Sequence, residues 1–181
     1  LQEKDTGILA QDPITVACRP GWDHVGVRCI PTGRAQQLLH LSVDGRLQVD
    51  APQGPTLPSN INNFPLDPAY GLAQALRDDM EGVPAALVRE EVVFDGVLLE
   101  ADLSILGAVT AQLHILPNRP AVQVHVELYD VDPDGVASLI SRGHQATRTA
   151  VAGCHVVFDV TTATICHRLV AGHRLRLVVA N

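Results

Sequence analysis

Aromatic residues are scarce in this sequence. They make up 3% of its 181 residues, with a single tryptophan, Trp22. Binding modules often stack sugars on exposed aromatic rings, and Trp22, Phe64 and Tyr70 are the candidates for such a platform. Because the three rings are scattered along the chain, packing is the simpler role for them.

Positive charge is also limited. The formal net charge is −7, and Lys4 is the only lysine. Without a basic stripe to meet phosphates, we expect no binding to nucleic acid. No stretch approaches the roughly 20 apolar residues of a membrane span, and no charged-then-apolar leader precedes Asp5. We therefore expect a cytoplasmic protein without a membrane partner.

The sequence lacks the pattern of a serine hydrolase nucleophile. Such a serine usually lies on a Gly-x-Ser-x-Gly turn with a base in reach. No serine has glycines at that spacing; the five are Ser42, Ser59, Ser104, Ser138 and Ser141. Ser42 and Ser104 fall in predicted strands, where a ladder or surface role is the simpler one. We assign no catalytic residue and no cofactor, and we expect that this chain alone is not an enzyme.

Two Cys-His pairs suggest zinc, namely Cys154-His155 and Cys166-His167. Neighbouring residues of a strand point to opposite faces, so both members of a pair cannot easily bind one ion. No Cys-x-x-Cys or His-x-x-x-His spacing adds support. We assign no metal ligand and expect core cysteines beside surface histidines.

Asp130-x-Asp132-x-Asp134-Gly135 imitates the first half of a calcium loop. The bidentate glutamate of such loops is missing, since Ser141 stands at its position, and no flanking helices are predicted. Proline and glycine within this run suit a tight turn. We interpret it as a solvated hairpin turn.

The four cysteines fit strand registers. Cys18 shares its side with Ile14 and Val16, and Cys154 is in register with Val156. With Cys29 on the apolar side of its own strand, these residues are expected to be buried free thiols, as in a reduced compartment. A bridge between Cys18 and Cys29 across neighbouring strands is the alternative.

Apolar residues alternate with polar ones through most of the chain. The clearest case is Val122 to Leu128, followed by a break at Asp132-Pro133-Asp134-Gly135. Period-two alternation predicts strands with one buried face. The segments that we predict as strands are 14–18, 25–30, 38–43, 47–49, 90–94, 98–105, 109–115, 122–131, 137–141, 156–160 and 175–179. Many strands and few helices predict an all-β protein, a β-sandwich or jelly roll.

Residues 51–68 differ in composition, with five prolines and three asparagines. A loop of this length normally lies across a surface or contacts another domain. Asp67-Pro68 reads as a helix start, and apolar residues at helical spacing follow up to Met80. We predict one short helix near 68–81, within a single domain at 14–181 that follows a loose lead-in at 1–13.

The order of these motifs resembles the C-terminal domain of the cocaine-esterase-like and X-prolyl dipeptidyl-peptidase family of serine hydrolases. The resemblance runs from about Ile14 to the end. It is carried by the segments Leu39 to Leu47, Phe64 to Pro68, Leu98 to Gly107, Glu127 to Gly135, Ser138 to Gly143 and Leu169 to Leu177.

This resemblance implies a galactose-binding-like jelly roll that packs on an α/β-hydrolase domain and helps wall its acyl or peptide pocket. The family's serine, aspartate and histidine lie upstream of the matching part, so none is transferred to this chain. Its glycine-rich turn is replaced by Ala69-Tyr-Gly-Leu72. A stand-alone module for carbohydrate or protein, or a structural oligomerisation domain, remains the alternative.

The family also continues beyond the strand that contains Gly172-His173-Arg174. We therefore expect a domain truncated at its C-terminal end. A missing final strand would leave an open sheet edge, which proteins usually cover or pair. On this ground the sequence predicts a homodimer through that edge.

Overall fold

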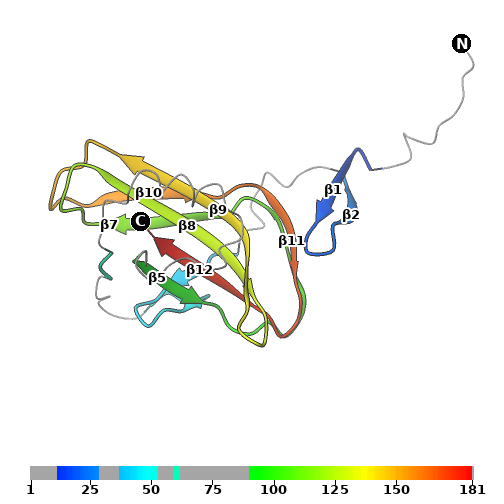
Figure 1. Cartoon of the computed structure of the whole chain (residues 1–181). Coiled ribbons are helices and arrows are strands. Elements are labelled where there is room, and N and C mark those ends of the chain that lie inside the picture. The colour runs from blue at the N-terminus through cyan, green and yellow to red at the C-terminus, as the bar shows by residue number, and fades with distance from the viewer. Residues whose placement is uncertain (1–11, 29–36, 53–58, 62–89, 181) are drawn as a thin grey trace, which may run out of the picture.

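The computed structural model describes residues 12–28, 37–52, 59–61 and 90–180. Twelve strands lie in these ranges (Figure 1). Their bounds are β1 Ile14–Cys18, β2 Asp23–Val27, β3 His40–Leu41, β4 Leu47–Gln48, β5 Glu91–Asp95, β6 Leu103–Gly107, β7 Thr110–Ile115, β8 Val122–Val131, β9 Ala137–Thr147, β10 Val156–Thr161, β11 Ile165–Leu169 and β12 Arg174–Ala180. The described part contains no helix, and the short helix expected near 68–81 lies outside it.

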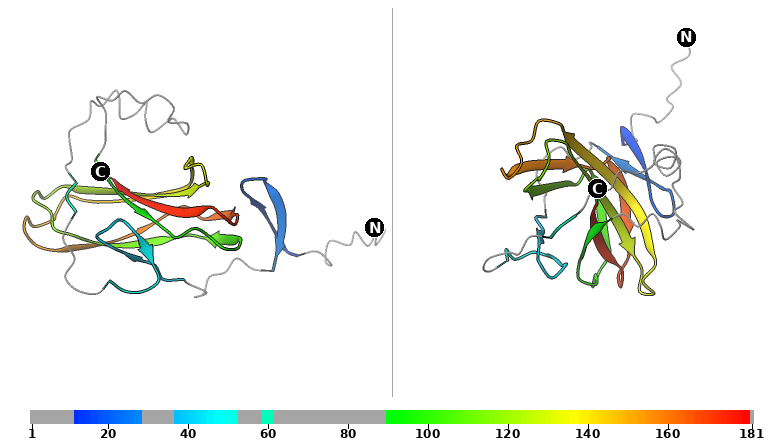
Figure 2. Two further views of the ribbon diagram at one scale, coloured as in Figure 1. Left: turned by 90° about the horizontal axis from the view of Figure 1, so that it is seen from below. Right: turned by 60° about the vertical axis from the view of Figure 1, so that its left-hand side comes forward.

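The largest sheet has four antiparallel strands in the order β5-β12-β8-β9. Two further antiparallel pairs, β7 with β10 and β6 with β11, form the facing layer (Figure 2). The inner face of the large sheet packs on these pairs in one apolar cluster that includes Val126, Leu128, Phe158, Val160 and Leu177. This arrangement confirms the predicted all-β sandwich.

Two hairpins complete the described structure. The β3–β4 hairpin turns at Gly45, where φ is +76°. The pairing of its two strands confirms the hairpin that the Asp-Gly pattern predicts. Its Leu47 is buried in the main core. The β1–β2 hairpin lies beside β11, at the edge of the sandwich (Figure 1).

β12 pairs on both sides, with β5 and with β8. Within the described residues the edges of the large sheet are therefore β5 and β9. The homodimer through a sheet edge stays a prediction.

Three strand assignments from the sequence need correction. The strand predicted at 98–105 begins later, at Leu103, and runs to Gly107. The return arm of the β8 hairpin runs to Thr147 rather than ending at Ser141, and Ile165–Leu169 was not predicted as a strand at all. The strand Ile165–Leu169 was missed because it contains cysteine, histidine and arginine, which hide the alternation of apolar and polar residues. Its inward residues are Ile165, His167 and Leu169.

No helix in the described residues is long and apolar enough to cross a membrane.

Candidate functional site

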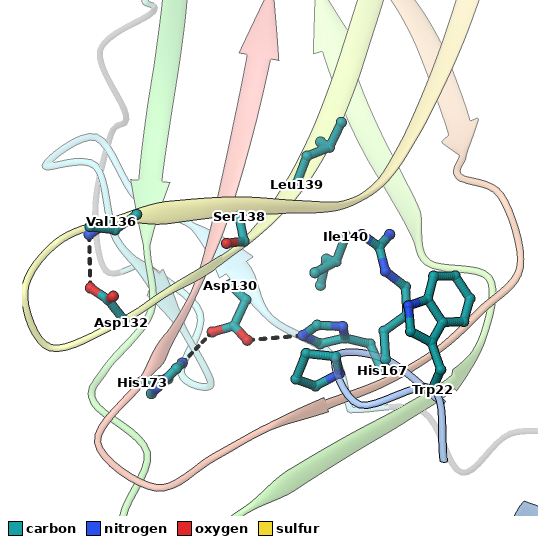
Figure 3. Close-up of a pocket in the computed structure, with 11 residues that line it drawn as sticks. Trp22, Asp130, Asp132, Val136, Ser138, Leu139, Ile140, His167 and His173 are labelled. Carbon is teal, nitrogen blue, oxygen red and sulfur yellow. Dashed lines mark hydrogen bonds and ion pairs between the residues drawn. The ribbon is translucent and has the colours of Figure 1, made fainter. Parts of the chain in front are cut away.

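A pocket of about 280 Å³ lies between the tip of the β1–β2 hairpin and the turn that joins the end of β8 to the start of β9 (Figure 3). Three segments that are distant in sequence form it. Its lining comprises Arg19, Pro20, Trp22, Asp130, Asp132, Val136, Ser138, Leu139, Ile140, His167 and His173.

The hairpin tip is fixed against β11 by covalent and backbone bonds. Cys18 forms a disulfide with Cys166 of β11. Next to it, the Arg19 N–H donates to the Cys166 carbonyl at 2.9 Å, and the Arg168 N–H donates to the Arg19 carbonyl at 2.9 Å. These bonds hold residues 19–22 as one wall of the pocket.

This disulfide corrects the expectation for the cysteines. Cys18 and Cys166 are not free core thiols, and the alternative bridge from Cys18 to Cys29 is excluded by the bond to Cys166. Cys154 is free but exposed, because it lies in the turn before β10 and not in the strand register. Cys29 is outside the described residues.

Asp130 is the centre of the pocket's hydrogen bonds. On β8 the inward positions are Val124, Val126 and Leu128, and Asp130 is the next in that register. Its exposure is 8%. A buried carboxylate needs partners, and both oxygens have one: Oδ2 lies 2.9 Å from His167 Nε2 and Oδ1 lies 2.7 Å from His173 Nδ1 (Figure 3).

A carboxylate can only accept hydrogen bonds, so each of the facing imidazole nitrogens donates its proton to Asp130. This fixes the orientation of both rings. His167 is only 3% exposed, which corrects the expectation of surface histidines beside core cysteines. In β11 the side chain of His167, and not that of Cys166, points inward. The histidine is therefore the buried member of this pair.

His173 is positioned by the turn between β11 and β12. Asp102 braces this turn, because its Oδ2 accepts from Arg168 Nε at 3.0 Å and its Oδ1 accepts from the Ala171 N–H at 2.9 Å. The hydrogen bond from Arg168, followed by the one from Ala171, holds the pKa of Asp102 below its ordinary value. The carboxylate therefore stays charged and the turn stays braced at neutral pH.

A serine, two histidines and an aspartate share this pocket, yet they do not form a hydrolytic triad. Ser138 lies opposite Asp130 across the β8–β9 ladder. Asp130 occupies the near nitrogens of both rings, and in Figure 3 their free nitrogens point away from Ser138. In this arrangement neither ring presents a base to the serine hydroxyl, which a nucleophilic serine needs.

The run Asp130 to Gly135 forms the predicted turn. The Val136 N–H donates to Asp132 Oδ1 at 2.8 Å, and Gly135 takes a φ of +89°. Asp134 is exposed, whereas Asp130 points inward, so the aspartates diverge. In the described ranges no group of three His, Cys, Asp or Glu side chains could hold a metal ion.

Trp22 is the one aromatic residue of the expected platform that lies in the described part. Its side chain is 63% exposed, and the Arg19 guanidinium lies over its ring at 5.6 Å from the centroid. Phe64 and Tyr70 fall outside the described residues, so the platform is not tested.

The sequence signal for this site was partial. The alternation along β8 already places Asp130 on the core face, where an unpaired carboxylate is costly. The two histidines that contact Asp130 come from β11 and the turn after it. Arg19 and Trp22 come from the β1–β2 hairpin, which is far from β11 in the sequence: Cys18 and Cys166, the residues that join them, are 148 positions apart. No local pattern links these segments.

Comparison with solved structures shows the same fold in larger enzymes. An aminopeptidase from a marine sediment archaeon, Thaumarchaeota archaeon, superposes with a TM-score of 0.68 at 17% identity, covering 93% of this chain and 33% of that one. An α-amino acid ester hydrolase superposes with a TM-score of 0.72 at 18% identity, covering 94% of this chain and 34% of that one. This chain thus spans about a third of their length. No curated protein matches the sequence.

The family model of the X-Pro dipeptidyl-peptidase C-terminal non-catalytic domain matches residues 32–180. The match covers all strands from β3 to β12 and begins after the β1–β2 hairpin. The chain belongs to the family of X-Pro dipeptidyl-peptidase C-terminal non-catalytic domains.

Proposed function

We propose that this chain serves as the C-terminal β-sandwich domain of an X-Pro dipeptidyl-peptidase-like serine hydrolase. It packs on the α/β-hydrolase domain and helps wall that domain's acyl or peptide pocket. The reaction itself, acyl transfer to serine and then hydrolysis, belongs to the partner domain. Support comes from the family match and from the threefold greater length of the two similar enzymes.

The observation that carries the packing role is a group of exposed apolar side chains at one end of the sandwich. Val97 is 78% exposed, Leu98 57%, Val136 62% and Val170 37%. We call these four residues the end patch. Backbone bonds join the loop of Val97 and Leu98 to the turn of Val170, since Leu99 N donates to His173 O and Gly172 N donates to Leu99 O, both at 2.8 Å.

Exposed apolar side chains gathered at one end of a domain support an interaction site there. The end patch borders the pocket, because Val136 lines it and His173 belongs to the joined turn. A hydrolase domain seated there would bury the apolar side chains and place its own pocket beside this end of the sandwich.

Replacing Val97 and Leu98 by aspartate tests the role. In the protein that joins this chain to its α/β-hydrolase domain, the double variant should lower the temperature at which the two domains dissociate or unfold together. It should also raise the KM for a p-nitrophenyl acyl ester. The matched control is Leu116→Asp, because Leu116 is 59% exposed at the opposite end.

Two outcomes would refute the proposal. The first is a gene for this chain that encodes no Gly-x-Ser-x-Gly hydrolase domain with it. The second is ester turnover by the purified 181-residue chain.

A further inference from the structure

The pocket contains a buried nitrogen without a hydrogen-bond partner. His167 Nε2 donates to Asp130, whereas Nδ1 has no partner and is shielded from solvent. In a neutral ring that donates through Nε2, Nδ1 is a bare acceptor. Figure 3 shows it on the side of the ring turned away from Asp130, toward Ile140 and Trp22. Buried polar groups in native proteins nearly always have partners, so a ligand that brings a donor would satisfy this nitrogen.

The pocket also contains a cation, Arg19, beside the carboxylates of Asp130 and Asp132. Arg19 lies over the Trp22 ring and forms no ion pair with any described residue. The backbone bonds to β11 hold the main chain of Arg19 at the pocket. Its exposed side chain contacts the Trp22 ring. A guanidinium presents a planar fork of donors that matches a carboxylate in a bidentate manner.

The remaining surface is suited to a short apolar group. Pro20, Leu139 and Ile140 contribute apolar side chains to the lining. The one buried charge, Asp130, is already compensated by two imidazole N–H groups, so it does not compete for Arg19.

We propose that this pocket binds a small carboxylic acid that also carries an N–H or O–H donor beside its carboxylate, such as an α-amino or α-hydroxy acid with an apolar side chain. The carboxylate binds Arg19, the donor meets His167 Nδ1, and the side chain packs on Leu139 and Ile140. This goes beyond the packing role, because the chain binds the ligand with its own residues.

The size of the pocket and the chemistry of its lining limit which ligands fit. A volume of about 280 Å³ lies near the lower end of the range of about 300–1,000 Å³ for ligand pockets, which favours a small ligand. A neutral sugar could stack on Trp22 but would leave the Arg19 charge unmatched. A simple anion would pair with Arg19 but leave Nδ1 unmatched.

Four matched probes test the two contacts separately. Leucine has the carboxylate and an amino donor, and 2-hydroxy-4-methylpentanoate has a hydroxyl donor instead. Leucinamide lacks the carboxylate, and 4-methylpentanoate lacks the donor. Calorimetric titration of the 181-residue chain should show saturable binding of one or both of the first two. Binding of the last two should be roughly tenfold weaker or more, as expected for a lost hydrogen bond to a charged group.

Variants assign the binding to the pocket. Arg19→Gln keeps the backbone bonds to β11 and should weaken binding of the carboxylate probes by about tenfold or more. Arg28→Gln is the control, because Arg28 follows the same hairpin and its side chain is 93% exposed, outside the pocket. Proton–nitrogen NMR spectra of the unaltered chain provide a second readout that needs no variant: leucine should shift the imidazole signals of His167.

Three results would overturn the proposal. One is the absence of saturable binding by either donor-bearing acid at millimolar concentration. Another is equal binding by the Arg19→Gln and unaltered chains. A third is preferential binding of a methyl glycoside with the same His167 shifts. None of these depends on whether the chain packs on a hydrolase domain.

Discussion

Cys18 and Cys166 are joined by a disulfide although 148 residues separate them. The bond attaches the β1–β2 hairpin, which precedes the matched family region, to β11 inside it. It thereby sets the distance between Arg19 and Trp22 on one side of the pocket and His167 on the other.

The pairing of the cysteines is directly testable. Digestion of the oxidised chain without reduction should yield one cross-linked peptide that contains Cys18 and Cys166, and Cys154 should be alkylated rapidly because it is exposed. Mass spectrometry reads both results. A cross-link from Cys18 to Cys29 would contradict the structure and restore the alternative that the sequence left open.

Removing the bridge should destabilise the protein. The Cys18→Ser and Cys166→Ser double variant is expected to lose about 2–5 kcal/mol of unfolding free energy, because a cross-link over a long loop restricts the unfolded chain. Urea denaturation measures the loss. Cys154→Ser serves as the control and should change stability by about 0.5 kcal/mol or less, as for exposed sites without special contacts.

Asp130→Asn should destabilise the sandwich by about 1–3 kcal/mol, because the amide replaces one accepting oxygen by a donor and leaves a buried imidazole N–H unpaired. Thermal unfolding at neutral pH measures the change. Asp134→Asn is the matched control, since Asp134 belongs to the same turn but is exposed. Equal effects of the two variants would show that the contacts to His167 and His173 do not stabilise the fold.

Asp95 should contribute stability that depends on pH. Arg176 donates to both of its oxygens, from Nε at 2.6 Å and from Nη2 at 2.9 Å. These bonds hold the pKa of Asp95 below its ordinary value of 3.8. The folded pKa is thus lower than the unfolded one, so the contribution is complete above about pH 4 and is lost as the pH falls through the folded pKa.

For the partly exposed Asp95, a gain of about 1 kcal/mol over Asp95→Asn is expected at pH 7, after allowance for solvent screening. Urea unfolding at a series of pH values from neutral to strongly acidic measures how this difference shrinks. Glu100→Gln, at an exposed position without a described partner, should show no such dependence. A constant difference across the series would contradict the ion pair.

Leu128 and Leu116 offer a test of the core. Leu128 is fully buried between the two layers, and Leu116 is 59% exposed. Leu128→Ala should lose about 2–5 kcal/mol of unfolding free energy, because it removes buried apolar surface and leaves a cavity. Leu116→Ala should change it by about 0.5 kcal/mol or less. Similar losses for both would place the core elsewhere.

The sequence by itself determined the sandwich and its family. Strict alternation in β7, β8 and β10 is a local property, because successive side chains of a strand point to opposite faces. The Asp-Gly and Asp-Pro-Asp-Gly turns are equally local, since glycine and proline restrict the backbone wherever they stand. The same alternation also placed Asp130 on the inner face, although the sequence could not name its partners.

Tertiary structure decided everything that joins distant segments. The contact between the β1–β2 hairpin and β11 decides three features: the partner of Cys18, the burial of His167 and the approach of Trp22 to β8. No local sequence pattern in either segment predicts this contact. Asp130 and His167 are 37 residues apart, yet each has an inward position in its own strand. Their pairing follows because two inward polar groups in an apolar core are stable only when they bond to each other.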